Sequence, residues 1–426
     1  MEAPAVKYSL CWIVCALAGL GMGAVLLPGQ ERAPAPPSGE AVSVTSPALN
    51  LPKNRDISKF SLLQRHFYLS AHRGTSWLVR ANRPDGRFVF GYAPALRQLL
   101  DGDHYLRQAA AAGTLARAAR FFADDRAAAV ARQALLTLLL ETREDAKNQV
   151  RRTLAPPGLV NPEAAAGVLL SAIYALPDPG KDLLDQAEEL ANFLRTRLQA
   201  DGSLLLDTGT PGGPDFESVR HFSGHALVGL ASNLETQAAS WKLQALVKAR
   251  PYYHDFWQKN KNVIMLPQHT CAYAEAFLRT KDPALAQAVF DMNDWLCTLQ
   301  YQQMDPRRSS WSGGFMPYVD GKAIASAPDV YSAPLAESLA DACRVARQAG
   351  DAPRFQRYRQ ALESALQFLT TLQYTEAGVQ HFADWYRPVL VGAYHASPLD
   401  GNVRLDFTQL TVAALVQYLE HVADLP

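Results

Sequence analysis

Apolar residues recur at three- and four-residue spacing through most of the chain after about residue 59, and alternating runs of β-branched residues are scarce. This period is typical of amphipathic α-helices that bury one face. Helix start and stop signals predict about twelve helices. They cover 59–82, 104–122, 126–143, 162–175, 183–199, 217–233, 237–258, 269–280, 284–302, 332–348, 354–373 and 405–422.

The connections between these helices alternate in length. Short connections follow the even-numbered helices, and long ones follow the odd-numbered helices, at 83–103, 144–161, 200–216, 259–268, 303–331 and 374–404. The alternation predicts six helical hairpins that close into a ring of six inner and six outer helices. The even-numbered helices carry small residues, such as AAAAG at 109–113, which let helices approach closely around an axis.

Several odd-numbered helices end in related sequences. WLVRANRPDGRFVF (77–90) matches FLRTRLQADGSLLL (193–206), and WLCTLQYQ (295–302) matches FLTTLQYT (368–375). Self-similarity of this kind is typical of repeat architectures. With these helix ends and the WSGGF segment at 311–315, the chain resembles the (α/α)6 toroid, or six-hairpin glycosidase-like, superfamily.

The resemblance implies an all-α (α/α)6 toroid and an enzyme related to glycoside hydrolases, polysaccharide lyases, or uronyl and N-acylglucosamine epimerases. Terpenoid cyclases share the architecture but use Asp-rich helix motifs, whereas the adjacent aspartates here, Asp124 and Asp125, lie in a short turn. Zinc-dependent relatives need Cys and His ligands, and Cys271 beside His269 is an isolated pair. We therefore expect no metal and no cofactor.

The amino terminus differs in composition from the helical part. Residues 8–27 form a 20-residue run without charge, long enough at about 1.5 Å per residue to cross a bilayer. A Pro- and Ala-rich stretch follows, and such sequences do not bury enough apolar surface to fold. We predict a membrane anchor or signal segment at 1–28, a linker at 29–57 and the toroid at 58–426. The toroid should then lie outside the cytoplasm, either anchored or secreted after signal cleavage.

The charge balance narrows the possible partners. The chain has 41 Lys and Arg against 41 Asp and Glu, so its formal net charge is zero. A protein that coats nucleic acid needs a basic surface to displace counterions, and we expect no nucleic-acid partner. We expect a polysaccharide or oligosaccharide instead, and a membrane contact through residues 8–27.

In a six-hairpin ring the inner helices run parallel, and their amino termini meet at the rim formed by the long loops. Long loops on a rigid scaffold usually carry function, and helix amino termini favour anions such as a uronate. Near the inner-helix starts and in these loops, which also hold Asp329 and Arg404, we select two sets of candidates. The catalytic candidates are Glu217, His221, His269, Tyr331, Asp384 and Asp406, and the substrate-binding candidates are Arg107, Trp311, Trp385, Tyr386 and Arg387.

Two mechanisms fit these residues. Hydrolysis needs two carboxylates, here Glu217 or Asp215 facing Asp384 or Asp406. Elimination or epimerisation of a uronate needs a base and an acid with cationic support, here from His221, His269, Tyr331 and Arg107. Structural roles are the alternatives, with packing or capping by His269, helix capping by Asp406, dipole stabilisation by Glu217 and packing by Trp311. At the level of the whole protein, the alternative is a non-catalytic toroid that binds glycans or proteins.

Overall fold

The computed structural model describes residues 56–209, 215–232, 234, 240–302 and 306–426. They belong to one compact unit, Pro52–Pro426. Within these ranges no helix is both long and apolar enough to cross a membrane. The expected anchor at 8–27 and the linker up to residue 55 lie outside the described residues.

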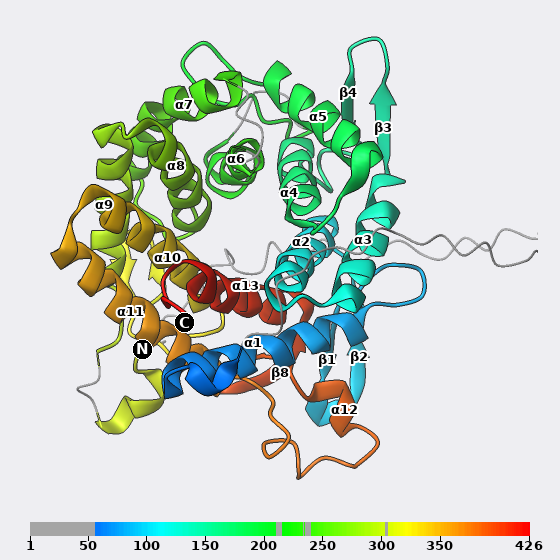
Figure 1. Cartoon of the computed structure of the whole chain (residues 1–426), viewed down its shortest axis with the longest axis vertical. Coiled ribbons are helices and arrows are strands. Elements are labelled where there is room, and N and C mark those ends of the chain that lie inside the picture. Colours follow the sequence, from blue (N-terminus) through cyan, green and yellow to red (C-terminus); the bar gives the residue numbers. More distant parts are fainter. Residues whose placement is uncertain (1–55, 210–214, 233, 235–239, 303–305) are drawn as a thin grey trace, which may run out of the picture. The chain divides into compact units, whose positions relative to one another are not determined.

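The inner helices form a closed ring around a central axis (Figure 1). Each packs against the next in chain order, and the last packs against the first, so the ring has no gap. The inner helices are α2 (Tyr105–Phe122), α4 (Pro162–Ala175), α6 (Phe216–Ala231), α8 (Leu266–Thr280), α10 (Ser332–Ala349) and α13 (Leu405–His421).

The outer helices surround this ring, and each is joined to its inner neighbour through a short turn or a long loop (Figure 1). They are α1 (Leu62–Ala81), α3 (Asp125–Leu139), α5 (Gly180–Thr196), α7 (Ser240–Lys259), α9 (Pro283–Cys297) and α11 (Ala352–Thr371). The twelve predicted helices are therefore confirmed in number and order, and one additional turn, α12 (Arg387–Leu390), interrupts the last long loop.

Small residues set the spacing of the inner ring, as expected from the sequence. A Cβ atom on Gly167 of α4 would lie 2.2 Å from the carbonyl oxygen of His225 on α6, and one on Gly229 would lie 2.5 Å from Gly167 Cα. A larger side chain at either position has no space, because backbone atoms of the facing helix occupy it. The glycines therefore fix how closely α4 and α6 approach.

The repeated ends of the outer helices share one local structure. After α1 and α5, Asp85 and Asp201 accept hydrogen bonds from the backbone two residues later, and the following Gly86 and Gly202 have φ angles of 84° and 90°. Positive φ favours glycine. Each glycine also lies against the next outer helix, since a Cβ atom would be 2.2 Å from Thr137 Oγ1 or from Lys248 O. The repeated sequence thus joins neighbouring outer helices.

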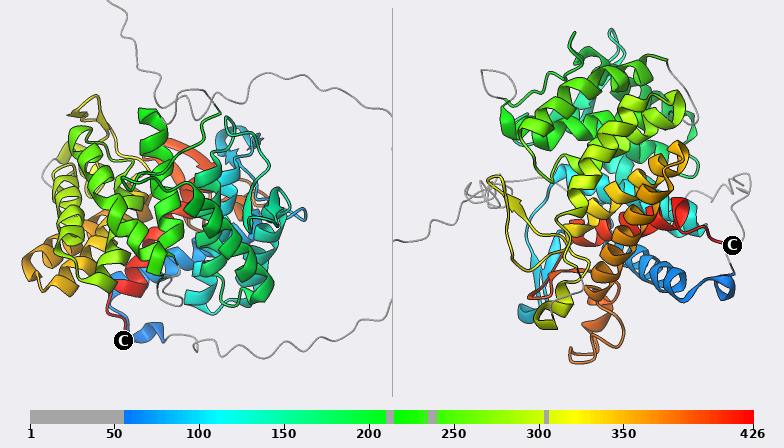
Figure 2. Two further views of the ribbon diagram at one scale, coloured as in Figure 1. Left: turned by 90° about the horizontal axis from the view of Figure 1, so that it is seen from above. Right: turned by 90° about the vertical axis from the view of Figure 1, so that its left-hand side faces the viewer.

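Short strands in the long loops were not predicted. A four-stranded antiparallel sheet, in the order β2-β1-β8-β7, joins the first long loop to the last, with Gly91 opposite Arg404. The right-hand view of Figure 2 shows the yellow β5–β6 hairpin and the cyan strands on the side away from the carboxyl terminus. The strands are β1 (Gly91–Ala93), β2 (Gln98–Leu100), β3 (Thr142–Asp145), β4 (Val150–Thr153), β5 (Tyr318–Val319), β6 (Lys322–Ala323), β7 (His395–Ser397) and β8 (Asp400–Arg404).

Candidate active site at the mouth of the ring

Three polar side chains meet where α10 and α13 begin. Arg404 donates to both oxygens of the Asp406 carboxylate, from Nη2 to Oδ2 at 2.6 Å and from Nε to Oδ1 at 3.0 Å. The Tyr331 hydroxyl donates to Asp406 Oδ2 at 3.2 Å and accepts from Arg404 Nη2 at 3.1 Å. The Asp406 side chain is only 7% exposed, so this carboxylate is satisfied almost entirely by protein groups.

The fold explains why these residues come together. Arg404 ends strand β8, and the pairing of β8 with β1 holds its backbone beside the first long loop. Asp406 lies in the first turn of α13, whose amino terminus has no side-chain cap. Tyr331 precedes α10, and its backbone N–H donates to Asp329 Oδ1 at 2.9 Å. The site is therefore built from two inner-helix starts and the sheet that links distant loops.

Arg107 of α2 brings a third inner helix to the same carboxylate. Its Nε lies 3.3 Å from Asp406 Oδ2. The guanidinium groups of Arg107 and Arg404 also lie over the Phe90 ring, each 5.8 Å from the ring centroid. Two arginines share one carboxylate, which leaves a net positive charge among these three residues, and the helix amino termini add to this potential. We call Arg107, Asp329, Tyr331, Arg404 and Asp406 the mouth group.

Asp329 differs from Asp406 in its surroundings. Burial raises the pKa of its carboxyl group to about 6, although the hydrogen bond from the Tyr331 backbone acts in the opposite direction. No arginine ion pair to Asp329 is present among the described residues, whereas two arginines contact Asp406. One carboxyl group near Tyr331 can thus be protonated close to neutral pH, while the other has two cationic partners.

Three histidines with lowered pKa values lie near one another at the mouth. Burial, together with the charges of His221 and His104, lowers the pKa of His225 to about 4, which indicates that the three rings lie near one another. Burial, with Arg107 nearby, also lowers the pKa of His104. Its Nδ1 atom is buried, and no hydrogen-bond partner for it exists in the described part of the chain. His104 is therefore a neutral ring with a free nitrogen beside the mouth group.

The remaining inner-helix candidates have mainly local partners. His269 is fully buried, its Nδ1 lies 2.9 Å from Met265 O and its Nε2 lies 3.3 Å from Ser223 Oγ. Burial lowers the pKa of its imidazole to about 4, so this ring packs as a neutral residue between α6 and α8. Glu217 is exposed and forms ion pairs with Arg220 at 2.6 Å and with His221 at 3.6 Å.

The candidates at 384–387 lie away from the mouth group. Asp384 is 90% exposed and pairs with Arg387 at 2.7 Å, and Trp385 is 68% exposed. The surrounding loop leans on outer helix α1, where Trp77 Nε1 donates to Val389 O at 2.9 Å. Figure 1 accordingly shows α12 outside the ring. The expected pairing of Glu217 or Asp215 with Asp384 across a cleft is therefore not formed, because the loop folds outward.

Two further aromatic candidates have packing contacts. The Trp311 ring is 5.3 Å from the Tyr301 ring and has the Arg308 guanidinium 4.8 Å above it. Tyr386 is 4% exposed and packs against the rings of Phe382 and Trp385. Neither contact involves a residue of the mouth group.

Three residues of the site were not among the selected candidates. Arg404 and Asp329 belong to loops that we expected at the mouth, yet only the structure shows that they flank Tyr331. His104 stands directly before α2, and this position at an inner-helix start was the available signal. In the described residues, no group of three or more His, Cys, Asp or Glu side chains is arranged to hold a metal ion.

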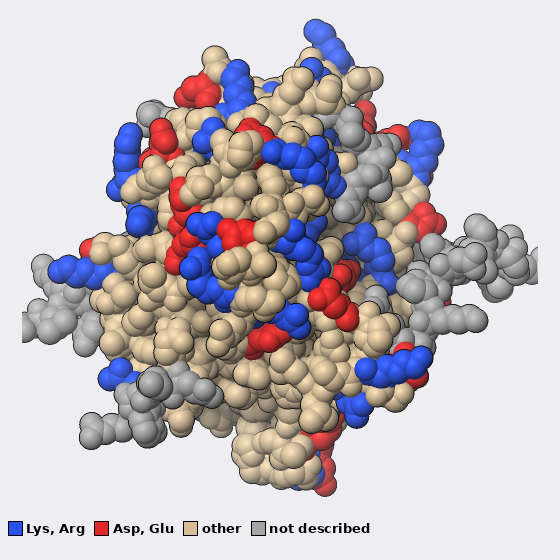
Figure 3. Space-filling view, turned by 60° about the vertical axis from the view of Figure 1, so that its left-hand side comes forward, with Lys and Arg blue, Asp and Glu red and all other residues tan. Residues whose placement is uncertain are grey.

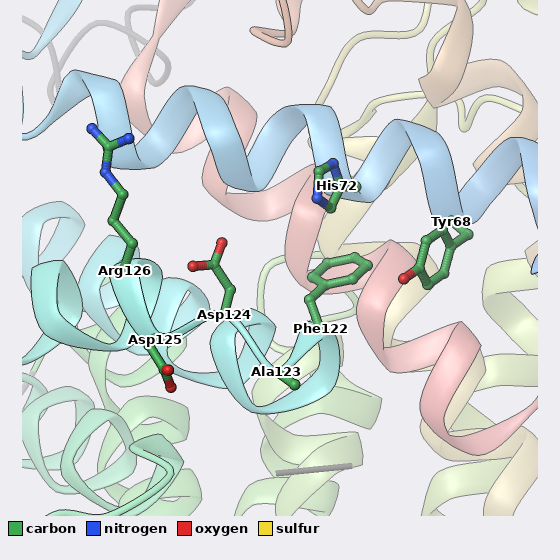
Figure 4. Close-up of a pocket in the computed structure, with 7 residues that line it drawn as sticks. All are labelled: Tyr68, His72, Phe122, Ala123, Asp124, Asp125 and Arg126. Carbon is green, nitrogen blue, oxygen red and sulfur yellow. The ribbon is translucent and has the colours of Figure 1, made fainter. Parts of the chain in front are cut away.

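Other surface features do not point to a second reactive centre. A depression of about 580 Å³ lies where α2 turns into α3, at the carboxyl ends of the inner helices (Figure 4). Its lining residues are Tyr68, His72, Phe122, Ala123, Asp124, Asp125 and Arg126. Asp124 caps α3 there by accepting from Ala127 N at 3.0 Å. On the face drawn in Figure 3, basic and acidic side chains are interspersed.

Comparisons with known proteins place this geometry in a fold. No family model and no curated protein sequence matches the chain. An unsaturated glucuronyl hydrolase specific for heparin is similar, with a TM-score of 0.56 and 15% identity over 83% of this chain and 97% of that one. Cellobiose 2-epimerase from Bacillus thermoamylovorans has a TM-score of 0.60 and 10% identity, over 84% of this chain and 99% of the epimerase. An inactive variant of an α-1,6-mannanase from Salegentibacter, in complex with α-1,6-mannotriose, has a TM-score of 0.56 and 10% identity, over 84% of this chain and 100% of the mannanase.

At these identities the likeness shows the fold alone. The closed ring of six inner helices and the similar solved structures confirm that this chain has the (α/α)6 toroid fold predicted from its helix ends.

Proposed function

We propose that the protein is a carbohydrate-active enzyme and that the mouth group is its active site. The observation that carries the proposal is the pair of unlike carboxyl groups on either side of Tyr331. Asp406 is paired with Arg404 and Arg107, and Asp329 has a pKa near 6. Two carboxyl groups in unlike surroundings are typical of acid and base roles.

Hydrolysis of a glycosidic bond is the reaction that these groups support best. Asp329 in its protonated form donates a proton to the leaving oxygen. Water attacks the anomeric carbon as the glycosidic bond breaks, and the Asp406 carboxylate, held in place by Arg404 and Arg107, accepts the proton that this water releases. Tyr331 lies between the two carboxyl groups and fixes their relative position through its backbone N–H and its hydroxyl.

The substrate that suits this mouth is an anionic saccharide. Arg107 and Arg404 together outweigh the single charge of Asp406, and the amino termini of α2, α10 and α13 point toward the same place. A uronate carboxylate or a sulfate would meet this potential. One of the neighbours in fold is an unsaturated glucuronyl hydrolase specific for heparin, which is consistent with the proposal.

Proton abstraction at C5 of a uronate is the second candidate, and His104 favours it. A neutral imidazole with an unpaired nitrogen can accept a proton, and Arg107 close by would stabilise the enolate-like charge that results. This reaction gives elimination or epimerisation rather than hydrolysis.

We also propose, from the sequence, that residues 8–27 anchor the enzyme in a membrane with the ring outside the cytoplasm.

A screen of the purified protein on uronic, sulfated and neutral polysaccharides tests these proposals. New reducing ends without unsaturated-uronate absorbance select hydrolysis, and reducing ends with that absorbance select elimination. Solvent deuterium at C5 without chain cleavage selects epimerisation. Binding without any of these products, unchanged in the Asp329→Asn variant, would replace the enzyme proposal with a glycan-binding toroid.

A further inference from the structure

The inner helices carry a second polar region below the mouth. They are almost entirely buried, yet α2, α6, α8 and α10 have partly exposed residues at helical spacing on the side facing the axis. On α2 these include Arg107, Ala110 and Arg117, and on α10 they include Pro334, Glu337 and Arg344. Because neighbouring helices cover the other sides of α2 and α10, this exposure indicates a water-accessible lumen that continues inward from the mouth.

Charged side chains close the far end of this lumen. Arg117 of α2 pairs with Glu420 of α13 at 2.7 Å, and Arg344 of α10 pairs with Glu275 of α8 at 2.6 Å. The positive charge of Arg117 acts on the pKa of the Cys271 thiol. Cys271 lies on α8, which is the helix across the ring from α2. Groups from opposite walls therefore lie close together, and the lumen narrows toward this end.

Glu337 lies between the mouth and this closed end. It comes six residues after Tyr331, which places it about 9 Å deeper along α10. Burial raises the pKa of its carboxyl group to about 8, with Arg117 opposing the shift. No hydrogen bond or ion pair to another described residue engages this side chain, in contrast to its neighbours Asp341 and Arg344, which pair at 2.9 Å. Glu337 thus presents a donor and an acceptor to whatever occupies the lumen.

We propose that the lumen is a blind subsite that receives the terminal sugar of the substrate, with Glu337 as a specificity-determining residue at its base. The inference rests on the proposed carbohydrate function and deepens it, because a blind subsite admits a chain end or a free monosaccharide and excludes the interior of a long chain. A sugar ring seated there offers hydroxyl groups to Glu337, and the bond to the next sugar then lies at the mouth group.

Three variants of the full chain test the inference. Ala110→Phe places a bulky ring in the lumen wall one turn below Arg107, Glu337→Ala removes the carboxyl group, and Glu337→Gln keeps a donor and an acceptor as the matched control. The probes are glucuronic acid, galacturonic acid, glucose and mannose, and polygalacturonate at equal sugar mass, with affinity measured by calorimetry. Circular dichroism and thermal unfolding establish that each variant is folded.

We expect at least one monosaccharide to bind the native protein. Its affinity should fall about tenfold or more in Ala110→Phe and in Glu337→Ala, and change less than threefold in Glu337→Gln. Polygalacturonate should compete poorly, because it has few ends per unit mass, and the first products from any polysaccharide that is cleaved should be mono- or disaccharides.

Two outcomes would overturn the inference. One is affinity that depends on sugar mass and not on the number of ends, with Ala110→Phe binding as well as the native protein. The other is a first product mixture of long internal fragments, which would leave the proposed activity intact and remove only the blind subsite. A monosaccharide that binds in the lumen without any turnover would instead remove the proposed activity and keep the subsite, and no binding by any probe would remove both.

Discussion

The mouth group and the segment around Asp384 have similar residue types and very different settings. Both combine carboxylates, arginines and aromatic rings near the end of a long loop. Asp406 is 7% exposed and bound by Arg404, Arg107 and Tyr331 from three inner helices or their approaches, whereas Asp384 is 90% exposed and bound by Arg387 three residues away. Residue composition alone does not make a site, because the contacts must join parts of the fold that are distant in sequence.

The largest effect is expected from Asp406→Asn. The variant leaves Arg404 and Arg107 without their shared carboxylate in a nearly buried place, and we expect the free energy of unfolding to fall by about 3 kcal/mol. Activity should fall by about a thousandfold. Denaturant titration and kcat/KM measure the two effects. Asp384→Asn is the matched control and should change neither, so equal behaviour of the two variants would remove the contrast between the regions.

Asp329→Asn should have the next largest effect, a loss of about a hundredfold in kcat. Its pKa is raised by burial to about 6, so the protonated form that donates is present below that pH and lost above it. The native enzyme should therefore lose kcat as the pH rises through about 6, and this limb should be absent from the residual activity of the variant. A native profile that is flat from pH 5 to 8 would contradict the acid role.

The same ionisation predicts a smaller effect on stability. The pKa of Asp329 in the folded protein lies above its ordinary value near 3.8. The contribution of this carboxyl group to the free energy of unfolding is therefore complete below about pH 4 and is lost as the pH rises through about 6. Thermal unfolding of the native protein and of Asp329→Asn between pH 4 and 7 measures it. The native protein should lose stability relative to the variant over this range, and parallel curves would be inconsistent with a raised pKa.

The smallest effect is expected from Trp385→Ala. This side chain is 68% exposed on a loop that packs against outer helix α1, and it contacts no residue of the mouth group. We expect kcat/KM on the substrate found by screening to change less than twofold and the unfolding midpoint to stay within experimental error. A loss of affinity for long chains only would show that the saccharide extends outward from the mouth across this loop.

The hairpin architecture could be predicted because it depends on features that repeat. Helix periodicity and alternating loop lengths recur six times, and the Asp-Gly turns after α1 and α5 have the same local reason in both places. The strands were missed because they are two to five residues long, too short for an alternating pattern to show. Their pairing is also decided by residues far apart, as for Gly91 and Arg404.

The site could be predicted only in part. Arg107, Tyr331 and Asp406 were selected because they stand near inner-helix starts, and the structure brings all three together. His269 has the same kind of position but turns toward α6 and Tyr253 instead of the axis. The rotation of a helix about its own axis decides whether such a side chain faces the mouth or a neighbouring helix. The sequence near a helix start does not specify that rotation.

Helix α13 supplies Asp406 and also closes the ring against α2, although these two helices are far apart in sequence. During synthesis, the first hairpins can form while α13 is still within the ribosome, but neither the ring nor the mouth can exist at that stage. Closure of the ring must therefore wait until α13 has left the ribosome, because this helix joins residues about 300 positions apart, such as Arg117 and Glu420. A truncation that removes α13 would thus open the ring and destroy the mouth group together.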